Sequence, residues 1–241
     1  MNENPVQETG NGQEAVKGGF FSSLIDIFLD PSKVFKRIDA GLQWWKAFIV
    51  LALANAAITW YGLPLQHQLA ALNPRGLPED QLARQLEQID SFGWVGVIAA
   101  PIMVLVVIMI VAGFVNMMVN LVSARSDFKK TLSLICFTGL IGLLEQVITI
   151  VIIHLRGIET IESRADAMVS LGPGALFSEA EGLLAAVMQA LSIFQIWYYI
   201  IFVLGLAFIF RMSWKKALVP AILLWAISVG LIMVGQMFSG A

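Results

Sequence analysis

Five apolar runs dominate the sequence, and each is long enough to cross the hydrocarbon core of a lipid bilayer. They cover about residues 47–65, 93–122, 132–154, 183–210 and 217–238. A helix needs roughly 20 residues to span a core of about 30 Å. A closed transmembrane barrel would instead alternate apolar and polar positions over short strands. We therefore expect an all-α polytopic membrane protein with five transmembrane helices.

Composition agrees with a membrane protein and excludes other classes. Hydrophobic residues make up 58% of the 241 residues and charged residues 13%, about half of the charge in a typical soluble domain. A net charge of −2 lacks the basic excess of a nucleic-acid-binding protein. One cysteine, Cys136, and two histidines predict no disulfide, no metal site and no cofactor. No nucleotide-binding loop, nucleophile elbow or zinc-protease motif supports an enzyme.

The loops differ in their content of Lys and Arg, which predicts the orientation. Eleven basic residues precede the first run or lie in the second-to-third and fourth-to-fifth connections, and four lie in the other two connections. Basic loops remain on the cytoplasmic side of a membrane. We expect the N-terminus in the cytoplasm and the C-terminus on the periplasmic or extracellular side.

The segment before the first run divides into two parts. Residues 1–19 are polar and are expected to form a disordered cytoplasmic tail. Residues 20–45 are expected to form amphipathic interfacial helices ahead of a transmembrane domain over 46–241, with Asp30 as the N-cap of a helix that starts at Pro31. They either cap the bundle and anchor it in the headgroup layer, or offer a platform for a partner. The candidate residues of this surface are Phe20, Phe21, Phe28, Pro31, Phe35, Lys36, Arg37, Trp44 and Trp45.

Glu145 is the one formally charged residue well inside an apolar run. A carboxylate at that depth is costly unless it is paired, buried or protonated. Matching depths along antiparallel helices places Gln195 at nearly the same level, with Tyr198 one turn away and Thr59 within reach. The group is either a proton or cation site on a transport path or a polar clamp that fixes helix pairing. Because no second midplane carboxylate completes a relay, the clamp is favoured.

Two further features concern single runs. Asn116 and Asn120 are spaced i and i+4 in the second run, where they line a shallow polar cavity or form hydrogen bonds across helices. Ser178 and Glu181 have the spacing of a capping box, so the fourth helix is expected to begin near residue 179 and to continue to 210.

Three stretches of the sequence together resemble the Yip domain family, five-span membrane proteins named for their interaction with Rab/Ypt small GTPases. They are LIDIFLDPSKVF at 24–35 followed by Trp44-Trp45, SDFKKTL at 126–132, and SIFQIW at 192–197 followed by Gly205 and Lys215-Lys216. The likeness is to bacterial members, which implies a bacterial cytoplasmic (inner) membrane. The Asp-Leu-Tyr-Gly-Pro signature of eukaryotic members does not occur, so the resemblance does not carry GTPase binding over to this chain.

The resemblance implies a five-helix bundle without enzymatic activity and, for eukaryotic members, a role in membrane traffic or organisation. We expect a non-enzymatic membrane protein that acts through residues 20–45, on the lipid bilayer and on a membrane-protein partner or a second copy. The alternative is a small transporter or channel component with a midplane polar site around Glu145.

Overall fold

In the computed structural model, helices are the only regular elements of the residues that it describes. Those residues are 18–73, 76–123, 125–163, 166–167, 169, 171–173, 184, 187–188 and 191–239, the last four without their side chains. The helices are α1 (Phe20–Leu29), α2 (Pro31–Asp39), α3 (Trp44–Tyr61), α4 (Leu63–Ala71), α5 (Glu79–Ser123), α6 (Phe128–Arg156), the 3-10 turn η1 (Ile158–Thr160), α8 (Ile193–Ile209) and α9 (Trp214–Ser239). The predicted all-α class is confirmed.

Three of the described helices, α5, α6 and α9, are each long and apolar enough to cross a membrane. The helices α3 and α4 meet at a bend of 42° and would together supply a fourth span. The helix α8 is apolar but has only 17 residues. Helix length and composition therefore support three spans, or four with the bent pair, and leave the predicted fifth without support of this kind.

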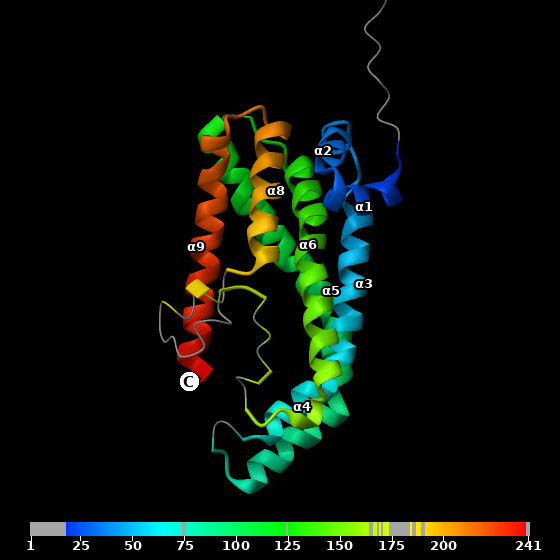
Figure 1. The fold of residues 1–241 in the computed structure, drawn as a ribbon, viewed down its shortest axis with the longest axis vertical. Helices are drawn as coiled ribbons and strands as arrows, with labels where there is room; N and C mark the ends of the chain where they lie inside the picture. Colours follow the sequence, from blue (N-terminus) through cyan, green and yellow to red (C-terminus); the bar gives the residue numbers. More distant parts are fainter. Residues whose placement is uncertain are drawn as a thin grey trace, which may run out of the picture.

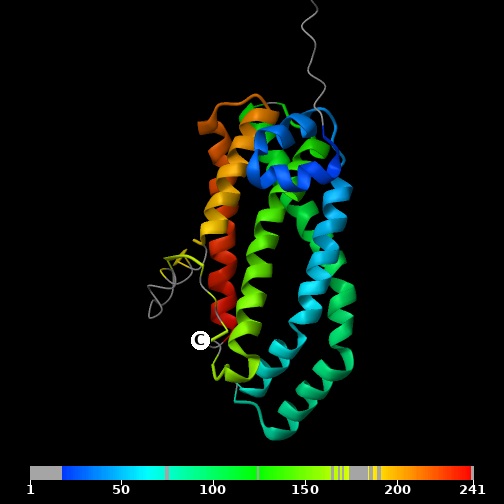
Figure 2. The same ribbon diagram turned by 45° about the vertical axis from the view of Figure 1, so that its right-hand side comes forward.

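The long helices run side by side in an elongated bundle (Figure 1). At one end α1 and α2 lie across the bundle, and at the other end α4 and the beginning of α5 project away from it (Figures 1 and 2). The end that carries α2, the start of α6 and the turn between α8 and α9 is called the basic end. Its basic residues are Lys33, Lys36, Arg37, Lys46, Arg125, Lys129, Lys130, Arg211, Lys215 and Lys216.

The first half of α6 forms the centre of the bundle. Asp127 caps this helix by accepting hydrogen bonds from the backbone N–H groups of Lys129 and Lys130, at 2.9 and 3.2 Å. The next two turns, residues 131–138, are buried throughout, and α6 packs against α1, α2, α3, α5 and α8. The helices α1, α2, α3, α5 and α8 are therefore positioned by contact with α6, whereas α9 packs on α5 and α8.

The fourth helix begins later than the sequence predicts. Backbone angles at Ser192 are extended (φ −98°, ψ 163°), and its hydroxyl accepts a hydrogen bond from the N–H of Gln195 at 2.9 Å. The N–H of Ile193 bonds to the carbonyl of Leu171, so α8 starts at Ile193. The prediction of one continuous helix from 179 to 210 is therefore wrong at Ser192. Ser178 and Glu181 lie outside the described residues.

Candidate functional site

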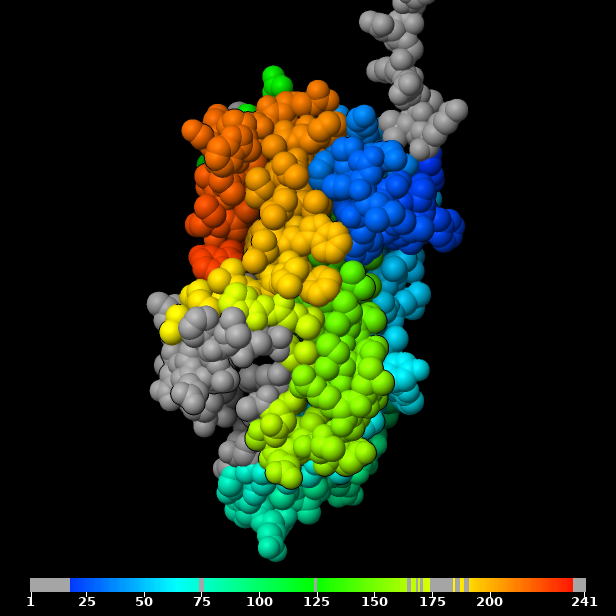
Figure 3. Space-filling model, in the orientation of Figure 1, coloured from blue at the N-terminus to red at the C-terminus, as the bar shows by residue number. Residues whose placement is uncertain are grey.

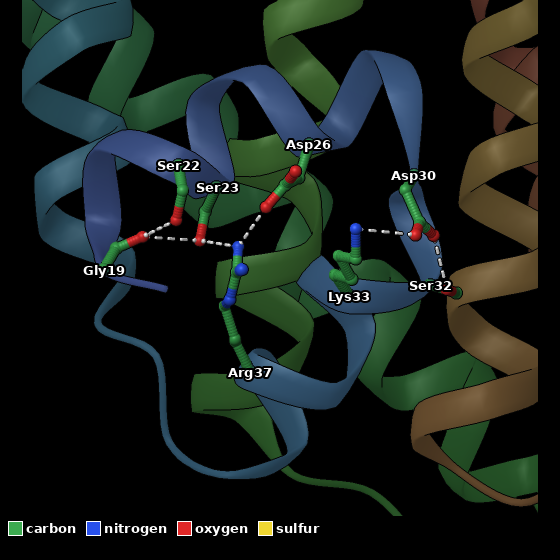
Figure 4. Close-up of polar contacts among 8 residues, drawn as sticks. All are labelled: Gly19, Ser22, Ser23, Asp26, Asp30, Ser32, Lys33 and Arg37. Carbon is green, nitrogen blue, oxygen red and sulfur yellow. Dashed lines mark hydrogen bonds and ion pairs between the residues drawn. The ribbon is translucent and has the colours of Figure 1, made fainter. Parts of the chain in front are cut away.

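The helices α1 and α2 form a short hairpin. Pro31 occupies the first turn of α2, as predicted, and its fixed φ suits that position. Asp30 stands at the N-cap but makes no side-chain cap bond. Its carboxylate instead accepts from the Ser32 hydroxyl at 2.5 Å and pairs with Lys33 at 3.2 Å (Figure 4). These two contacts, Ser32 first, lower the pKa of Asp30.

Arg37 joins the two helices of the hairpin (Figure 4). Its Nη1 donates to the Ser23 hydroxyl at 3.0 Å and to the Asp26 carboxylate at 2.6 Å. The Arg37 side chain is 6% exposed and that of Asp26 is 20% exposed. A charge-assisted hydrogen bond of this kind is stronger than a neutral one. The structure therefore places Arg37 inside the hairpin, whereas the sequence placed it on the outer surface.

One side of the hairpin packs on α6 and α8, and the space-filling view shows the hairpin in contact with its neighbours on that face of the molecule (Figure 3). Ring contacts join Phe20 to Phe137 of α6 at 6.3 Å, Phe28 to Trp197 of α8 at 5.8 Å, and Phe35 to Phe208 of α8 at 6.1 Å. The fully or nearly fully buried apolar residues of this interface are Ile27, Val34, Phe35 and Ile38. The hairpin is thus part of the hydrophobic core and is not a loose appendage.

Asp39, at the end of α2, links three connections of the basic end. Its carboxylate accepts from the Lys130 ammonium at 2.5 Å and from the Arg211 guanidinium at 2.8 Å. The hydrogen bond from the Lys130 ammonium, and to a lesser extent that from the Arg211 guanidinium, holds the pKa of Asp39 below its usual value. Partial burial of the carboxylate acts in the opposite direction. Sequence reasoning missed this cluster, because its members are separated by 91 and 172 positions.

The other side of α1 exposes a stripe of large apolar side chains. Phe21, Ile25 and Leu29 are 80%, 61% and 79% exposed, and their i, i+4, i+8 spacing places them on one helix face. Ser23 and Ile27 on the opposite side are buried. We call these three residues the apolar stripe. Of the other predicted surface residues, Lys36 is exposed and Trp45 is 45% exposed, while Pro31 and Trp44 are half-buried.

Exposed tryptophans mark both ends of the bundle. Trp45 and Trp214 lie at the basic end, each with a neighbouring lysine ammonium 5.5 to 5.8 Å from its ring. Trp60 and Trp94 are 57% and 51% exposed towards the other end. Along α3, the interval from Trp44 to Trp60 measures about 24 Å at ~1.5 Å per residue. Tryptophans on either side of such an interval are typical of the two interfaces of a bilayer.

The predicted midplane residues do not form one cluster. Glu145 is half-buried on α6, and among the described residues no hydrogen bond or ion pair reaches its carboxylate. Gln195 lines a groove between α8 and α9. Tyr198 stacks on Phe202 at 5.8 Å. The Thr59 hydroxyl donates to the Asn55 carbonyl of its own helix at 2.9 Å.

The two asparagines of α5 differ in their surroundings. The Thr131 hydroxyl of α6 donates to the Asn116 side-chain carbonyl at 3.3 Å, whereas Asn120 is exposed. Asn116 therefore joins two helices. Within the described part of the chain, no three His, Cys, Asp or Glu side chains come together in a way that suits a metal ion.

Comparison with known proteins gives two matches. The family model described as Yip1 domain matches residues 25–235. Among curated proteins, the membrane protein YknW of Bacillus subtilis (strain 168) is 25% identical over 221 residues, which are 90% of this chain and 90% of that protein. No solved structure matches the chain.

Proposed function

The chain belongs to the Yip1 domain family, and from this premise we propose that it is a non-enzymatic membrane protein whose working surface is the α1–α2 hairpin. The hairpin lies in the headgroup layer of the cytoplasmic leaflet. There it organises the adjacent lipid and meets a membrane-protein partner or a second copy of the chain. The host membrane in this proposal is the inner membrane of a bacterium.

The proposed topology has five spans, namely α3, α5, α6, α8 and α9, with the N-terminus in the cytoplasm. Support comes from the basic end, where basic residues from three separate connections gather, as the positive-inside rule requires of a cytoplasmic face. The helix α9 runs away from that end (Figure 1), which agrees with an odd number of spans. Helix α8 is about 25 Å long, and a bilayer accommodates so small a mismatch by local thinning.

The observation that carries the proposal is the apolar stripe on a helix that is otherwise firmly docked. Burial of one large apolar side chain stabilises a protein by about 1.5–3 kcal/mol, so leaving Phe21, Ile25 and Leu29 in water forgoes several kcal/mol. An amphipathic helix in the plane of the interface recovers that free energy by burying its apolar face about 5–10 Å into the boundary between headgroups and acyl chains. The exposed lysines Lys33 and Lys36 on the adjoining α2 suit an anionic surface.

Complementation tests the proposal. A host strain that lacks the chain receives the wild type, the triple variant Phe21→Gln, Ile25→Gln, Leu29→Gln, or the control Glu145→Gln, at matched membrane levels. The stripe variant is expected to lose function and the control to retain it. The reverse pattern, with an active stripe variant and an inactive Glu145→Gln, would refute the proposal in favour of transport through the bundle.

Photo-crosslinking then identifies what the stripe meets in living cells. A benzophenone amino acid at position 25 is compared with the same group at Ile222 on the lipid-facing side of α9. Adducts with one defined membrane protein, or with a second copy, at position 25 alone would assign a protein contact. Adducts with lipid at both positions would assign the role of α1 to the lipid layer, and labelling of neither lipid nor protein at position 25 would contradict the placement of α1.

A further inference from the structure

A groove of about 510 Å³ runs along the outer surface of the bundle between α8 and α9. Its walls are mainly apolar and include Ile196, Ile200, Leu218 and Ile222. Three of these residues, Ile196, Ile200 and Ile222, are about half exposed, so the groove opens sideways towards the lipid. In a membrane this shape receives a hydrocarbon chain from the side.

Along α9, the groove has about the length of one membrane leaflet. Trp214, in the first turn of α9, lies at the end of the groove nearest the basic end, and Trp225 lines it deeper in the bundle. Eleven residues of helix separate them, which is about 16 Å at ~1.5 Å per residue. Half of a hydrocarbon core of about 30 Å is about 15 Å. The α9 wall therefore extends over about one leaflet from the headgroup level at the basic end, and the α8 wall continues to Leu191, just before that helix begins.

One uncompensated positive charge, that of Lys215, stands beside the mouth of the groove. Lys215 is exposed, and its ammonium has no ion pair or hydrogen bond to any described residue. Lys216 is two residues from Trp214 and therefore lies on the opposite face of α9 from the residues that line the groove. The Lys215 ammonium lies over the ring of Trp214, a lining residue, at 5.8 Å. Lys130 and Arg211 of the basic end, by contrast, share the single carboxylate of Asp39. The mouth thus has free positive charge for an anion.

The deep end of the groove has few polar groups. The Tyr199 hydroxyl is engaged with Ser228 and Gln195, and the indole Nε1 of Trp225 is buried without an acceptor among the described residues. A hydrocarbon chain supplies no acceptor to this donor. The deep end therefore contributes mainly shape, and the preference for an anionic lipid arises at Lys215.

We propose that this groove binds one anionic phospholipid, with an acyl chain between α8 and α9 and the phosphate at Lys215. The apolar walls, the length of the α9 wall and the free charge beside the mouth each match a part of that lipid. The lipid belongs to the cytoplasmic leaflet if the proposed orientation holds, whereas binding itself depends on neither the orientation nor the hairpin.

Native mass spectrometry of the full chain in detergent provides the test. Dioleoyl phosphatidylglycerol is titrated against dioleoyl phosphatidylcholine, which has the same acyl chains and no net charge. We expect one tightly retained phosphatidylglycerol per chain. The variant Lys215→Gln should lower that affinity about five-fold, because a basic residue near an anionic headgroup contributes about that factor. The matched control Lys129→Gln, also at the basic end but away from the groove, should leave it unchanged.

A second pair of variants tests the groove itself. Ile222→Trp places a larger side chain at the edge of the groove and should reduce binding of both lipids, whereas Leu223→Trp, on a neighbouring exposed position that does not line it, should not. Equal retention of phosphatidylglycerol by the wild type, Lys215→Gln, Ile222→Trp and both control variants would overturn the proposal. Loss of lipid binding in Ile222→Trp without any effect of Lys215→Gln would overturn the assignment to an anionic lipid. A change of oligomeric state in Ile222→Trp with unchanged lipid binding would assign the groove to a second copy instead.

Discussion

Replacement of Asp39 by Asn is expected to loosen α2 from the bundle without unfolding the long helices. In the wild type, Asp39 and Lys130 are 25% and 29% exposed, so their charge-assisted hydrogen bond is partly shielded from water, while Arg211 is 67% exposed. A hydrogen bond to a charged group contributes about 1.5–3 kcal/mol when shielded, and an exposed pair adds at most about 1 kcal/mol. Discounted for the remaining exposure, the loss should be about 1–2 kcal/mol.

Amide hydrogen exchange of α2 measures this loss directly. A loss of 1–2 kcal/mol in the local opening free energy corresponds to exchange about 5- to 30-fold faster in α2, with no change in α9. Asp30→Asn is the matched control, because that carboxylate is 41% exposed and bonds only within its own turn. Equal exchange in the two variants would refute the reasoning that Asp39 joins α2 to α6 and to the turn after α8.

The pH dependence of the same protection has a definite sign. Because the folded pKa of Asp39 lies below its ordinary value of 3.8, the carboxylate stabilises the docked state fully above that value. This contribution is lost as the pH falls below 3.8 and through the folded pKa. Protection factors of α2, corrected for intrinsic exchange, should fall on acidification in the wild type and change less in Asp39→Asn.

Three further predictions concern packing and burial. Gly205→Ala should destabilise the protein by about 1–3 kcal/mol, which is measured as a lower midpoint of thermal unfolding in detergent. The reason is that a Cβ at this position would meet Leu134 of α6 and lie 2.9 Å from Phe35 of α2. The control Gly230→Ala, whose Cβ would have nothing within 4 Å, should leave the midpoint unchanged. Arg37→Met should release α1 from α2 and raise its amide exchange by at least tenfold, because Asp26 loses its partner, and the exposed control Lys36→Met should have little effect. Cys136, which is fully buried, should resist N-ethylmaleimide in the folded protein and react once it is unfolded.

The positions of the helices could be predicted from the sequence where the length of an apolar run is sufficient to define a helix. The second, third and fifth runs correspond to α5, α6 and α9, and the lead-in was correctly divided at Asp30-Pro31. The start of α8 could not be found in this way, because Ser192 lies inside an apolar run. A local signal was present, since Ser192 and Gln195 have the capping-box spacing, but hydropathy outweighed it.

The candidate site was harder to predict than the helices. A basic residue next to an apolar face predicts an exposed interfacial residue. Lys36 is exposed, but the same pattern includes the buried Arg37, whose partners on α1 follow only from the hairpin geometry. The Asp39 cluster depends on contacts between segments far apart in the chain. Depth matching of Glu145 with Gln195 considered height alone, whereas the helical rotation of Gln195 turns it towards α9.

The measurement that tests the central claim most directly is the depth of α1 in a bilayer. Nitroxide labels at positions 21, 25 and 29, and at the exposed position 32 on α2, are compared in anionic vesicles by their collision rates with oxygen and with a water-soluble nickel chelate. The account predicts high oxygen and low nickel accessibility along the apolar stripe and the opposite at position 32. Nickel accessibility along the stripe as high as at position 32 would show that α1 lies in water, and would contradict the account.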